Sequence, residues 1–221
     1  MVRNLIIAID GPSGAGKGTV ARTLAERLGY RHVDTGAMYR AVAWKAAHDG
    51  VPLDDDAAVA TLATRARLDQ QGGCVTIDGH DVTRAIRTPE MDKAAAAVAK
   101  LPHLRSVLVS LQRELGADGG VVMEGRDIGT VVFPEADLKI YLDASAEERA
   151  RRRASDPAHS GGGQSIANVQ SDLVARDKTD STRTVAPLSL AHDAVRIDTT
   201  GMPVDAVVNQ ALKLVNEKLA G

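Results

Sequence analysis

A glycine-rich segment close to the N-terminus carries the first recognisable chemistry in the chain. Its nine residues are Gly11, Pro12, Ser13, Gly14, Ala15, Gly16, Lys17, Gly18 and Thr19. An apolar run precedes this segment and helical periodicity follows it, so it should join a strand to a helix. Such a loop wraps backbone N–H groups around phosphate oxygens, and the helix N-terminus adds its dipole. Lys17 would supply a point charge to the β- and γ-phosphates of a nucleotide. This context disfavours the alternative, a glycine-rich turn without a ligand.

The residues after the lysine depart from the usual phosphate-loop pattern. That pattern has a serine or threonine directly after the lysine as a Mg²⁺ ligand, whereas here Gly18 comes first and Thr19 follows. The Gly-Lys-Gly-Thr ending resembles the nucleoside monophosphate kinases and differs from GTPases and shikimate kinases. Thr19 is therefore a candidate Mg²⁺ ligand. The direct ligand stays open, because Mg²⁺ dehydrates reluctantly and can be held mainly by phosphates and waters.

Two further segments place polar side chains where strands of a parallel sheet should end. The first is Asp34-Thr35-Gly36-Ala37-Met38-Tyr39-Arg40, one helix after the glycine-rich loop. Ligands bind at the carboxyl edge of such sheets, where this hydroxyl, aromatic ring and arginine could contact a base, a sugar and a phosphate. The spacing supports equally well a helix capped by Asp34 or Thr35 whose Arg40 is only solvated.

The second segment, Glu124-Gly125-Arg126-Asp127, follows the apolar run Val121–Met123. The planar guanidinium of Arg126 suits phosphate because it can bond two oxygens at once. Asp127 could accept a hydrogen bond from an exocyclic amine, which cytosine has and uracil lacks. Alternatively, Arg126 and Asp127 only pair to support the loop.

Charged residues also cluster on two expected helices. Ser145-Ala-Glu-Glu148 is typical of a capping box, after which Arg149, Arg152 and Arg153 share one face while Arg151 lies elsewhere. A Glu148–Arg152 pair at this spacing is worth only ~0.3–0.5 kcal/mol, which does not account for so many arginines. They either form a polar surface or close over a transferring phosphoryl group. Farther on, Arg176, Asp180 and Arg183 would share a face of one helix, and such charges are usually only solvated.

Short apolar runs alternate with helical-period segments, which indicates an α/β fold with a mostly parallel sheet. The expected strands are 5–9, 121–123, 138–142 and 195–197. One helix should begin after residue 16 and end at Gly29, and another should begin at Pro203. Asp78-Gly79 between β-prone runs predicts a tight hairpin, flanked by helical stretches around 54–67 and 90–115. The glycine-rich stretch 155–165 should be mobile and exposed.

Composition excludes several classes of protein. Aromatic residues make up 2% and the net charge is −2, which disfavours a nucleic-acid reader that stacks bases in a basic groove. Cys74 is the only cysteine, so an internal disulfide and a multi-cysteine metal site are excluded. No stretch reaches the roughly 20 apolar residues of a membrane-spanning helix, and a cytoplasmic location is expected. The six histidines have no ligand-like spacing.

Taken together, these motifs resemble the bacterial cytidylate kinases. The matching stretches also include Ile86-Arg87-Thr88 and Val185-Ala186-Pro187-Leu188, and they run in order from residue 9 to about 190. The resemblance implies an α/β, adenylate-kinase-like phosphate-loop core with a central parallel sheet. It assigns 1–34 and 100–221 to the core, 35–99 to an antiparallel monophosphate-binding insert with a hairpin near 74–82, and 149–175 to a short lid.

The resemblance further implies transfer of the γ-phosphate of ATP to CMP or dCMP, giving ADP and CDP or dCDP, with Mg²⁺ accompanying ATP. Residues 11–19 would bind ATP, and the catalytic side chains would be Lys17, Arg126, Arg149, Arg152 and Arg153. On the acceptor side, the resemblance implies that Thr35 and Asp127 read the cytosine, and that Arg105 and Arg183 line the base pocket with Tyr39 nearby. It implies that Arg40 and Arg126 grip the acceptor phosphate. Arg176 and Asp180 would contact the pentose and the lid side. A monomer without nucleic-acid or membrane partners is expected.

Two other readings remain. One is a different small-molecule kinase of this fold, acting on UMP, AMP or shikimate, although Gly18 argues against shikimate and Asp127 against AMP. The other is a non-enzymatic nucleotide switch, which would not need the acceptor-side arginines. No general base is expected, because an acceptor phosphate is already anionic near pH 7.

Overall fold

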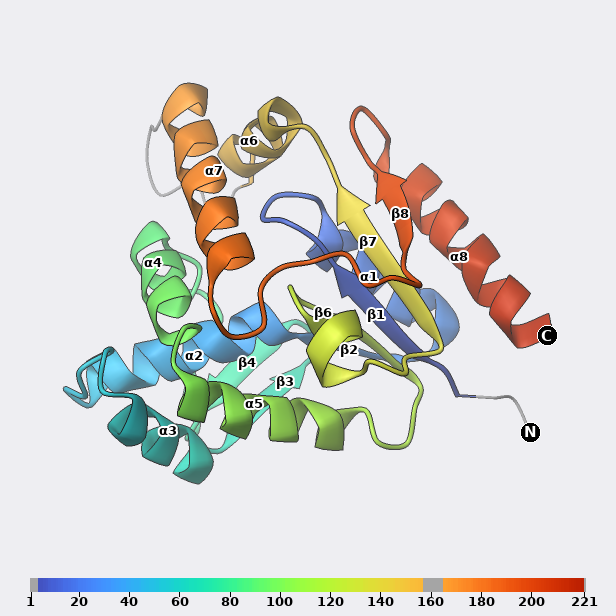
Figure 1. The fold of residues 1–221 in the computed structure, drawn as a ribbon. Helices are drawn as coiled ribbons and strands as arrows, with labels where there is room; N and C mark the ends of the chain where they lie inside the picture. The colour runs from blue at the N-terminus through green and yellow to red at the C-terminus, as the bar shows by residue number, and fades with distance from the viewer. Residues whose placement is uncertain (1–3, 157–164, 221) are drawn as a thin grey trace. The chain divides into compact units, whose positions relative to one another are not determined.

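The computed structural model describes residues 4–156 and 165–220 (Figure 1). Within these residues the chain forms two compact units. The larger comprises 4–33, 115–154 and 165–220, and the smaller comprises 34–114 with 155–156.

A five-stranded sheet forms the centre of the larger unit. Its strands, in spatial order, are β2 (Arg31–Asp34), β6 (Val121–Glu124), β1 (Ile6–Asp10), β7 (Leu138–Asp143) and β8 (Val195–Asp198). The pairs β1–β6, β1–β7 and β7–β8 are parallel. The four strands expected from apolar runs are all present, and the predicted α/β fold with a central parallel sheet is confirmed.

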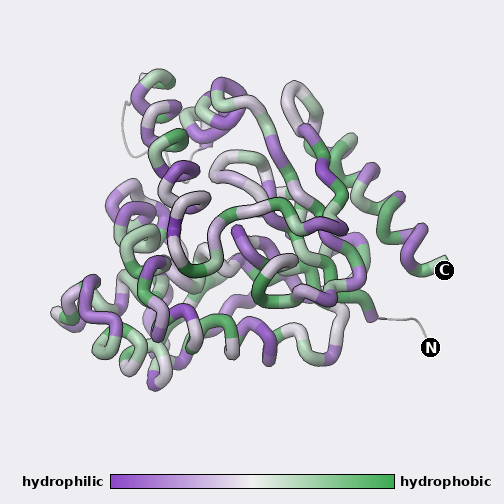
Figure 2. The backbone as a smooth tube through the Cα atoms, viewed as in Figure 1, coloured by the Kyte–Doolittle hydropathy of each residue, from purple (hydrophilic) through white to green (hydrophobic). Residues whose placement is uncertain are grey.

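Two helices bury their apolar faces against this sheet. α1 (Lys17–Leu28) and α8 (Val204–Ala220) contribute residues such as Leu24 and Val208 to one core cluster with β1, β6, β7 and β8. The alternation of apolar and polar residues along α8 is visible in Figure 2. α1 ends as predicted at Gly29, whose left-handed backbone (φ 65°) lets its N–H bond the last carbonyls of the helix. This packing fixes the start of α1 beside the end of β1.

Three other helical segments complete the larger unit. They are the π-helical turn η1 (Ile128–Val132), α6 (Ala146–Ala154) and α7 (Ile166–Thr182). α6 and α7 pack through Ala150, Val169 and Leu173. Only half of the predicted capping box is present: the Ser145 hydroxyl accepts the Glu148 N–H (3.2 Å), but the Glu148 carboxylate turns to neighbouring arginines. The ion pairs along α6 attract this carboxylate away from the cap.

The smaller unit contains helices around a small antiparallel sheet. Its elements are α2 (Thr35–His48), α3 (Asp56–Arg65), β3 (Leu68–Gln71), β4 (Cys74–Ile77), β5 (His80–Asp81), α4 (Pro89–Val98) and α5 (Pro102–Leu115), which reaches the boundary between the units. Asp78 and Gly79 both have positive φ (50° and 80°) between the paired strands β4 and β5. This is the twist that a two-residue hairpin requires, so the Asp-Gly prediction is correct.

The expected helical stretch over 90–115 is instead two helices, bent by 100° at residues 99–101. Pro102 causes the break, because proline lacks an N–H and its ring disfavours helical angles in the preceding residue. Among the described residues, no single helix is long and apolar enough to cross a membrane; one bent pair, α4 with α5, meets that test by length and composition alone.

The predicted division into core, insert and lid stays a prediction. α5 groups with residues 34–114, whereas the sequence analysis assigned residues from 100 onward to the core. The predicted lid, 149–175, spans parts of α6 and α7. Its central residues 157–164, and with them most of the stretch expected to be mobile, lie outside the described residues.

Candidate active site

The glycine-rich loop lies at the carboxyl end of β1, and its glycines are required by close neighbours. A Cβ at Gly11 would lie 2.0 Å from the carbonyl oxygen of Leu142, a distance that backbone cannot tolerate. At Gly14 a Cβ would lie 3.0 Å from the Arg149 Cβ, and the backbone is left-handed there (φ 78°). β7 and α6 therefore pack directly on the loop.

Lys17 opens α1 and is buried, with only 6% of its surface exposed. Its ammonium donates to the Pro12 carbonyl within its own loop (2.7 Å). Burial, and after it the charge of Arg126, lower the pKa of Lys17 to about 7, although the charges of Glu124 and Asp10 oppose this shift. The ammonium is thus short of negative charge, which a bound phosphate would supply.

The carboxylate of Glu124 lies close to Gly18, the glycine that follows Lys17. Glu124 is buried at the end of β6, and its Oε1 would lie 3.2 Å from a Cβ at Gly18. His32 Nε2 holds the same oxygen at 3.0 Å. An alanine at position 18 would therefore make this carboxylate shift by a few tenths of an ångström. This position of Glu124 was not predicted, although its place at the end of an apolar run was a signal for it.

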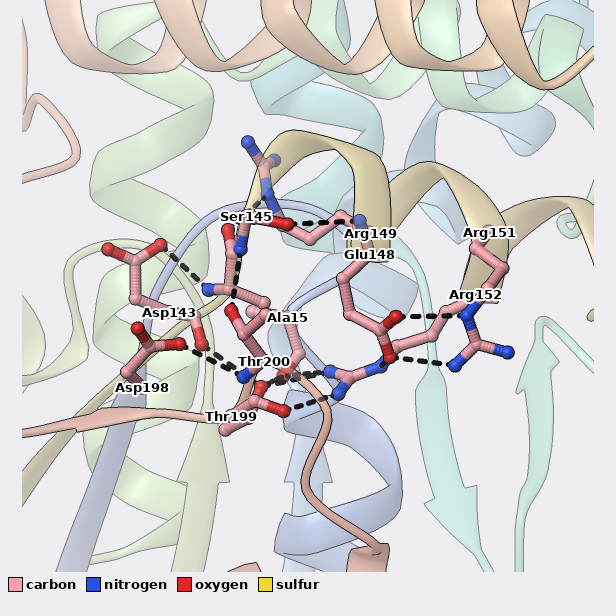
Figure 3. Close-up of polar contacts among 11 residues, drawn as sticks. Ala15, Asp143, Ser145, Glu148, Arg149, Arg151, Arg152, Asp198, Thr199 and Thr200 are labelled. Carbon is pink, nitrogen blue, oxygen red and sulfur yellow. Dashed lines mark hydrogen bonds and ion pairs between the residues drawn. The ribbon is translucent and has the colours of Figure 1, made fainter.

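Two arginines of α6 face the loop (Figure 3). Arg149 is buried and donates through Nη1 to the Ser13 carbonyl (3.0 Å), through Nε to the Ala144 carbonyl (3.1 Å), and to Asp177. These acceptors hold α6 against the loop. The Asp177 carboxylate also accepts the Ser13 N–H (3.4 Å), a contact that the sequence analysis did not anticipate.

Arg152 bridges α6 to the turn after β8. It bonds the Glu148 carboxylate (2.8 Å) and both the hydroxyl (2.9 Å) and the carbonyl (2.6 Å) of Thr199, with the Ala15 carbonyl at 3.5 Å (Figure 3). The expected Glu148–Arg152 pair is confirmed. Hydrogen bonds from Arg151, and then from Arg152, lower the pKa of Glu148 to about 2.

The remaining arginines of α6 differ in exposure. The Arg151 side chain is 62% exposed and pairs with Glu148. Arg153, at the far end of the same helix, is partly exposed. Closure of Arg149, Arg152 and Arg153 over a phosphoryl group stays a prediction.

Two carboxylates from other segments hold Arg126 and the two residues that follow Asp127. Arg126 Nε donates to Asp180 of α7 (3.0 Å), and its Nη1 donates to the Gly125 carbonyl (3.2 Å). The buried Asp10, at the end of β1, accepts the N–H groups of Ile128 (2.9 Å) and Gly129 (2.7 Å) at the start of η1. Burial raises the pKa of Asp10 to about 6, although these two N–H groups oppose the shift. Sequence reasoning missed Asp10, because its partners lie far along the chain.

Arg183 does not lie on α7 as predicted. The helix ends at Thr182, and Arg183 has extended angles (φ −63°, ψ 142°). Its Nε donates to the Ala186 carbonyl (2.5 Å), and its Nη2 lies 3.6 Å from Asp127. Ala186 has a left-handed φ of 50°, which is strained for alanine. Arg176 and Asp180 stay on α7, where Arg176 is half-buried and Asp180 is buried.

The remaining predicted acceptor residues belong to the smaller unit. Asp34 caps α2 by accepting the Ala37 N–H (2.8 Å), so the capping alternative is correct for that residue. Arg40, however, is not merely solvated: it bonds Asp34 (3.1 Å) and lies 3.8 Å from Asp92. Its Nε is buried without a hydrogen-bond partner among the described residues. One donor of Arg40 is therefore left unsatisfied by the described residues.

Thr35, Tyr39 and Arg105 lie in the same unit. Thr35 is buried at the start of α2. The buried Arg105 guanidinium lies over the Tyr39 ring, 5.7 Å from its centroid, and donates to the Ala99 carbonyl (3.4 Å). A cation over an aromatic face is a favourable contact that orders both side chains.

A parallel sheet, a glycine loop and a buried lysine at the start of the next helix together define a P-loop phosphotransferase fold. Solved structures with this architecture include shikimate kinase from Acinetobacter baumannii, in complex with shikimate (TM-score 0.52, 18% identity, covering 98% of this chain and 95% of that one). Shikimate kinase from Bacteroides thetaiotaomicron is similar (TM-score 0.52, 11% identity, 97% and 99%). At these identities the likeness concerns the fold alone.

Proteins with similar sequences show to which family of this fold class the chain belongs. The family model for cytidylate kinase matches residues 7–217. The cytidylate kinase of Desulfitobacterium hafniense is 48% identical (99% of this chain and 96% of that protein), and that of a Geobacillus species is 45% identical (99% and 100%). The chain belongs to the cytidylate kinase family, which confirms the resemblance drawn from its motifs.

Proposed function

We propose that this protein transfers the γ-phosphate of ATP to CMP or dCMP, producing ADP and CDP or dCDP. The observation that carries the proposal is the buried Lys17 in the glycine-rich loop of a chain whose relatives are cytidylate kinases. Phosphoryl transfer leaves little covalent work for the protein, so positioning and charge stabilisation supply the catalysis.

On the donor side, backbone N–H groups of residues 11–19 bind the phosphates of ATP, and Lys17 neutralises the β- and γ-oxygens. Arg126 contributes positive charge from the loop after β6. Arg149 and Arg152 fix the loop by holding its carbonyls, which keeps its N–H groups aimed at the phosphates. Arg153, farther along α6, is the third arginine proposed to approach the transferring group.

Mg²⁺ accompanies ATP in this proposal. The residues present suit it, since carboxylate oxygen is a ligand type that Mg²⁺ prefers and Glu124 brings one against Gly18 of the loop. No group of three or more candidate metal-ligating side chains occurs among the described residues, so phosphate oxygens and water would fill most of the coordination sphere. Glu124 and Thr19 are the candidate protein ligands. The metal would screen the phosphate charges.

On the acceptor side, the residues act as two sets, one on each unit. In the smaller unit Thr35 reads the cytosine, Arg105 and Tyr39 line the base pocket, and Arg40 grips the acceptor phosphate with its available Nε. The larger unit supplies the second set: Arg126 for the phosphate, Asp127 for the exocyclic amine of cytosine, Arg183 for the base, and Arg176 and Asp180 for the pentose.

A coupled assay of ADP release tests the function. ATP and Mg²⁺ are held constant while CMP, dCMP, UMP, AMP and shikimate are compared as acceptors, with an acceptor-free control. Release with CMP or dCMP well above the others is expected. Release with AMP but not CMP would refute the substrate, and nucleotide binding without acceptor-dependent release would favour the switch alternative.

The proposal extends to the state of the protein. It acts as a monomer on free nucleotides, which are cytoplasmic metabolites, with no nucleic-acid or membrane partner. Light scattering after size exclusion, with and without ATP and CMP, checks the oligomeric state, and a dimer mass would contradict this point.

A further inference from the structure

Two carboxylates on one face of α7 reach two different loops of the larger unit. Asp177 and Asp180 are three residues apart, so their side chains lie on the same side of the helix. Asp180 bonds Arg126 in the loop after β6. Asp177 reaches the glycine-rich loop, where its Oδ1 accepts the Ser13 N–H. A single helical turn thus ties both phosphate-facing loops of this unit.

The Asp177 contact includes a second donor, the guanidinium of Arg149. Arg149 is buried and donates to the Ser13 carbonyl as well. Both backbone groups of Ser13 are therefore held, the N–H by Asp177 and the carbonyl by Arg149. The Asp177 side chain is itself 21% exposed, so its replacement does not leave a cavity in the core.

We propose that Asp177 is a positioning residue for the donor phosphates, acting through Arg149 on residues Ser13 and Gly14 of the loop. Without the carboxylate, the buried positive charge of Arg149 loses its ion pair with Asp177, and the Ser13 N–H loses its acceptor. The loop then holds the β- and γ-phosphates less accurately. Because transfer depends on alignment, a displacement of about 1 Å can cost roughly 100-fold in rate.

The simpler alternative is that Asp177 only braces α6 against α7. These helices already pack through Ala150, Val169 and Leu173, so a brace would add stability without favouring one substrate. The two roles differ in their kinetic signature. A brace changes the melting temperature and affects both substrates alike, whereas a positioning residue affects ATP selectively.

The test compares Asp177→Asn with Asp172→Asn, a control on the exposed surface of the same helix. Each variant is assayed for kcat, the KM for ATP, the KM for CMP, ADP release without acceptor, and thermal melting. For Asp177→Asn we expect kcat to fall about 10- to 100-fold and the KM for ATP to rise several-fold. The KM for CMP should stay within about twofold, and Asp172→Asn should match wild type. Equal changes in both KM values, or no kinetic change, would overturn the proposal.

Two further variants test the path through Arg149. In an Arg149→Gln background, Asp177→Asn should add little, because residues that act as a unit are non-additive. A full additional loss would show that Asp177 acts independently of Arg149. Asp177→Glu, which keeps the charge, should recover part of the rate, and its failure to exceed Asp177→Asn would contradict a role for the charge.

This inference rests on the proposed phosphotransfer to CMP, and the wild-type protein separates the two. If wild type does not phosphorylate CMP or dCMP, the proposed function fails. If wild type is active while Asp177→Asn matches it in every parameter, only the role of Asp177 fails.

Discussion

Arg149 in the larger unit and Arg40 in the smaller unit were both predicted to meet phosphate, yet their surroundings differ. Arg149 gives Nε and Nη1 to two backbone carbonyls and a carboxylate. Arg40 has carboxylates beside its Nη atoms but keeps a buried Nε without a hydrogen-bond partner among the described residues. The difference separates two uses of arginine. We propose that Arg149 shapes the phosphate-binding loop and that Arg40 keeps a donor for the ligand.

The largest expected effect concerns Lys17. Although its ammonium donates to the Pro12 carbonyl, we group Lys17 with Arg40 as a charge that is directed at the ligand. Lys17→Ala should lower kcat by about 100- to 1,000-fold, the cost of losing one preorganised charge or donor in the transition state. Arg126→Ala should act in the same direction. Both are measured by coupled ADP release with CMP, with folding checked by circular dichroism and the exposed Lys213→Ala as control. Near-normal turnover in both folded variants would remove these residues from the mechanism.

The second prediction contrasts Arg149→Gln with Arg40→Gln. Arg149→Gln leaves two carbonyls and Asp177 without their donor, so unfolding free energy should fall by about 3 kcal/mol. Arg40→Gln should change stability less, and should raise the KM for CMP by about tenfold or more through the loss of a charged phosphate contact.

Urea denaturation and steady-state kinetics on both variants decide the matter. If Arg149→Gln is stable and loses only turnover, its loop contacts are secondary to catalysis. If Arg40→Gln leaves the KM for CMP unchanged, the free Nε has no part in acceptor binding.

Asp10 offers a smaller effect that depends on pH. Burial raises its pKa in the folded chain from 3.8 to about 6. Between these values the folded protein retains a proton that the unfolded chain releases, so the stability tied to this proton is complete below pH 4. It is lost as pH rises through 6, by up to about 3 kcal/mol. Asp10→Asn cannot titrate. The unfolding free energy of wild type minus that of Asp10→Asn should therefore decrease from pH 4.5 to pH 7.5, and a constant difference would contradict the shift.

The smallest effects are expected from glycine-to-alanine substitutions. They distinguish a glycine packed against a side chain from a glycine that only gives the backbone a left-handed turn. Gly29→Ala meets no atom within 4 Å but must adopt a left-handed angle, which costs about 1–2 kcal/mol. At Gly18, within α1, alanine gains up to about 1 kcal/mol of helix propensity but presses on Glu124. Melting of Gly18→Ala should stay close to wild type while its KM for ATP rises. An unchanged KM would show that the Glu124 carboxylate yields without disturbing the loop.

Much of the architecture follows from local sequence because its causes are local. The apolar runs form the expected strands, Gly29 ends α1, and Asp78-Gly79 makes the hairpin turn. The errors occur where one residue overrides a pattern. Pro102 divides the expected stretch over 90–115 into α4 and α5, and α7 ends just before Arg183. At Pro102 the periodicity continued through a residue that a helix cannot include in its interior.

For the functional side chains too, some features could be predicted from the sequence and others could not. The residue types and spacing of 11–19, 34–40 and 124–127 identified a phosphate-binding loop and an acceptor side, and the family match bears out the resemblance they carried. The roles of individual residues there remain predictions. The spacing of residues could not show that Arg149 and Arg40 have different partners, because in the sequence each is simply an arginine near a polar segment.

The sequence by itself determined the strand–loop–helix that binds phosphate, the parallel sheet behind it and the family to which the chain belongs. Only the tertiary structure decided which charges face which partners. Asp10 bonds N–H groups 118 and 119 residues away, and Arg149 meets the Ser13 carbonyl across 136 residues. Such contacts depend on which segments the sheet order and helix packing bring together. A buried charge then binds the donor or acceptor that this packing leaves unsatisfied.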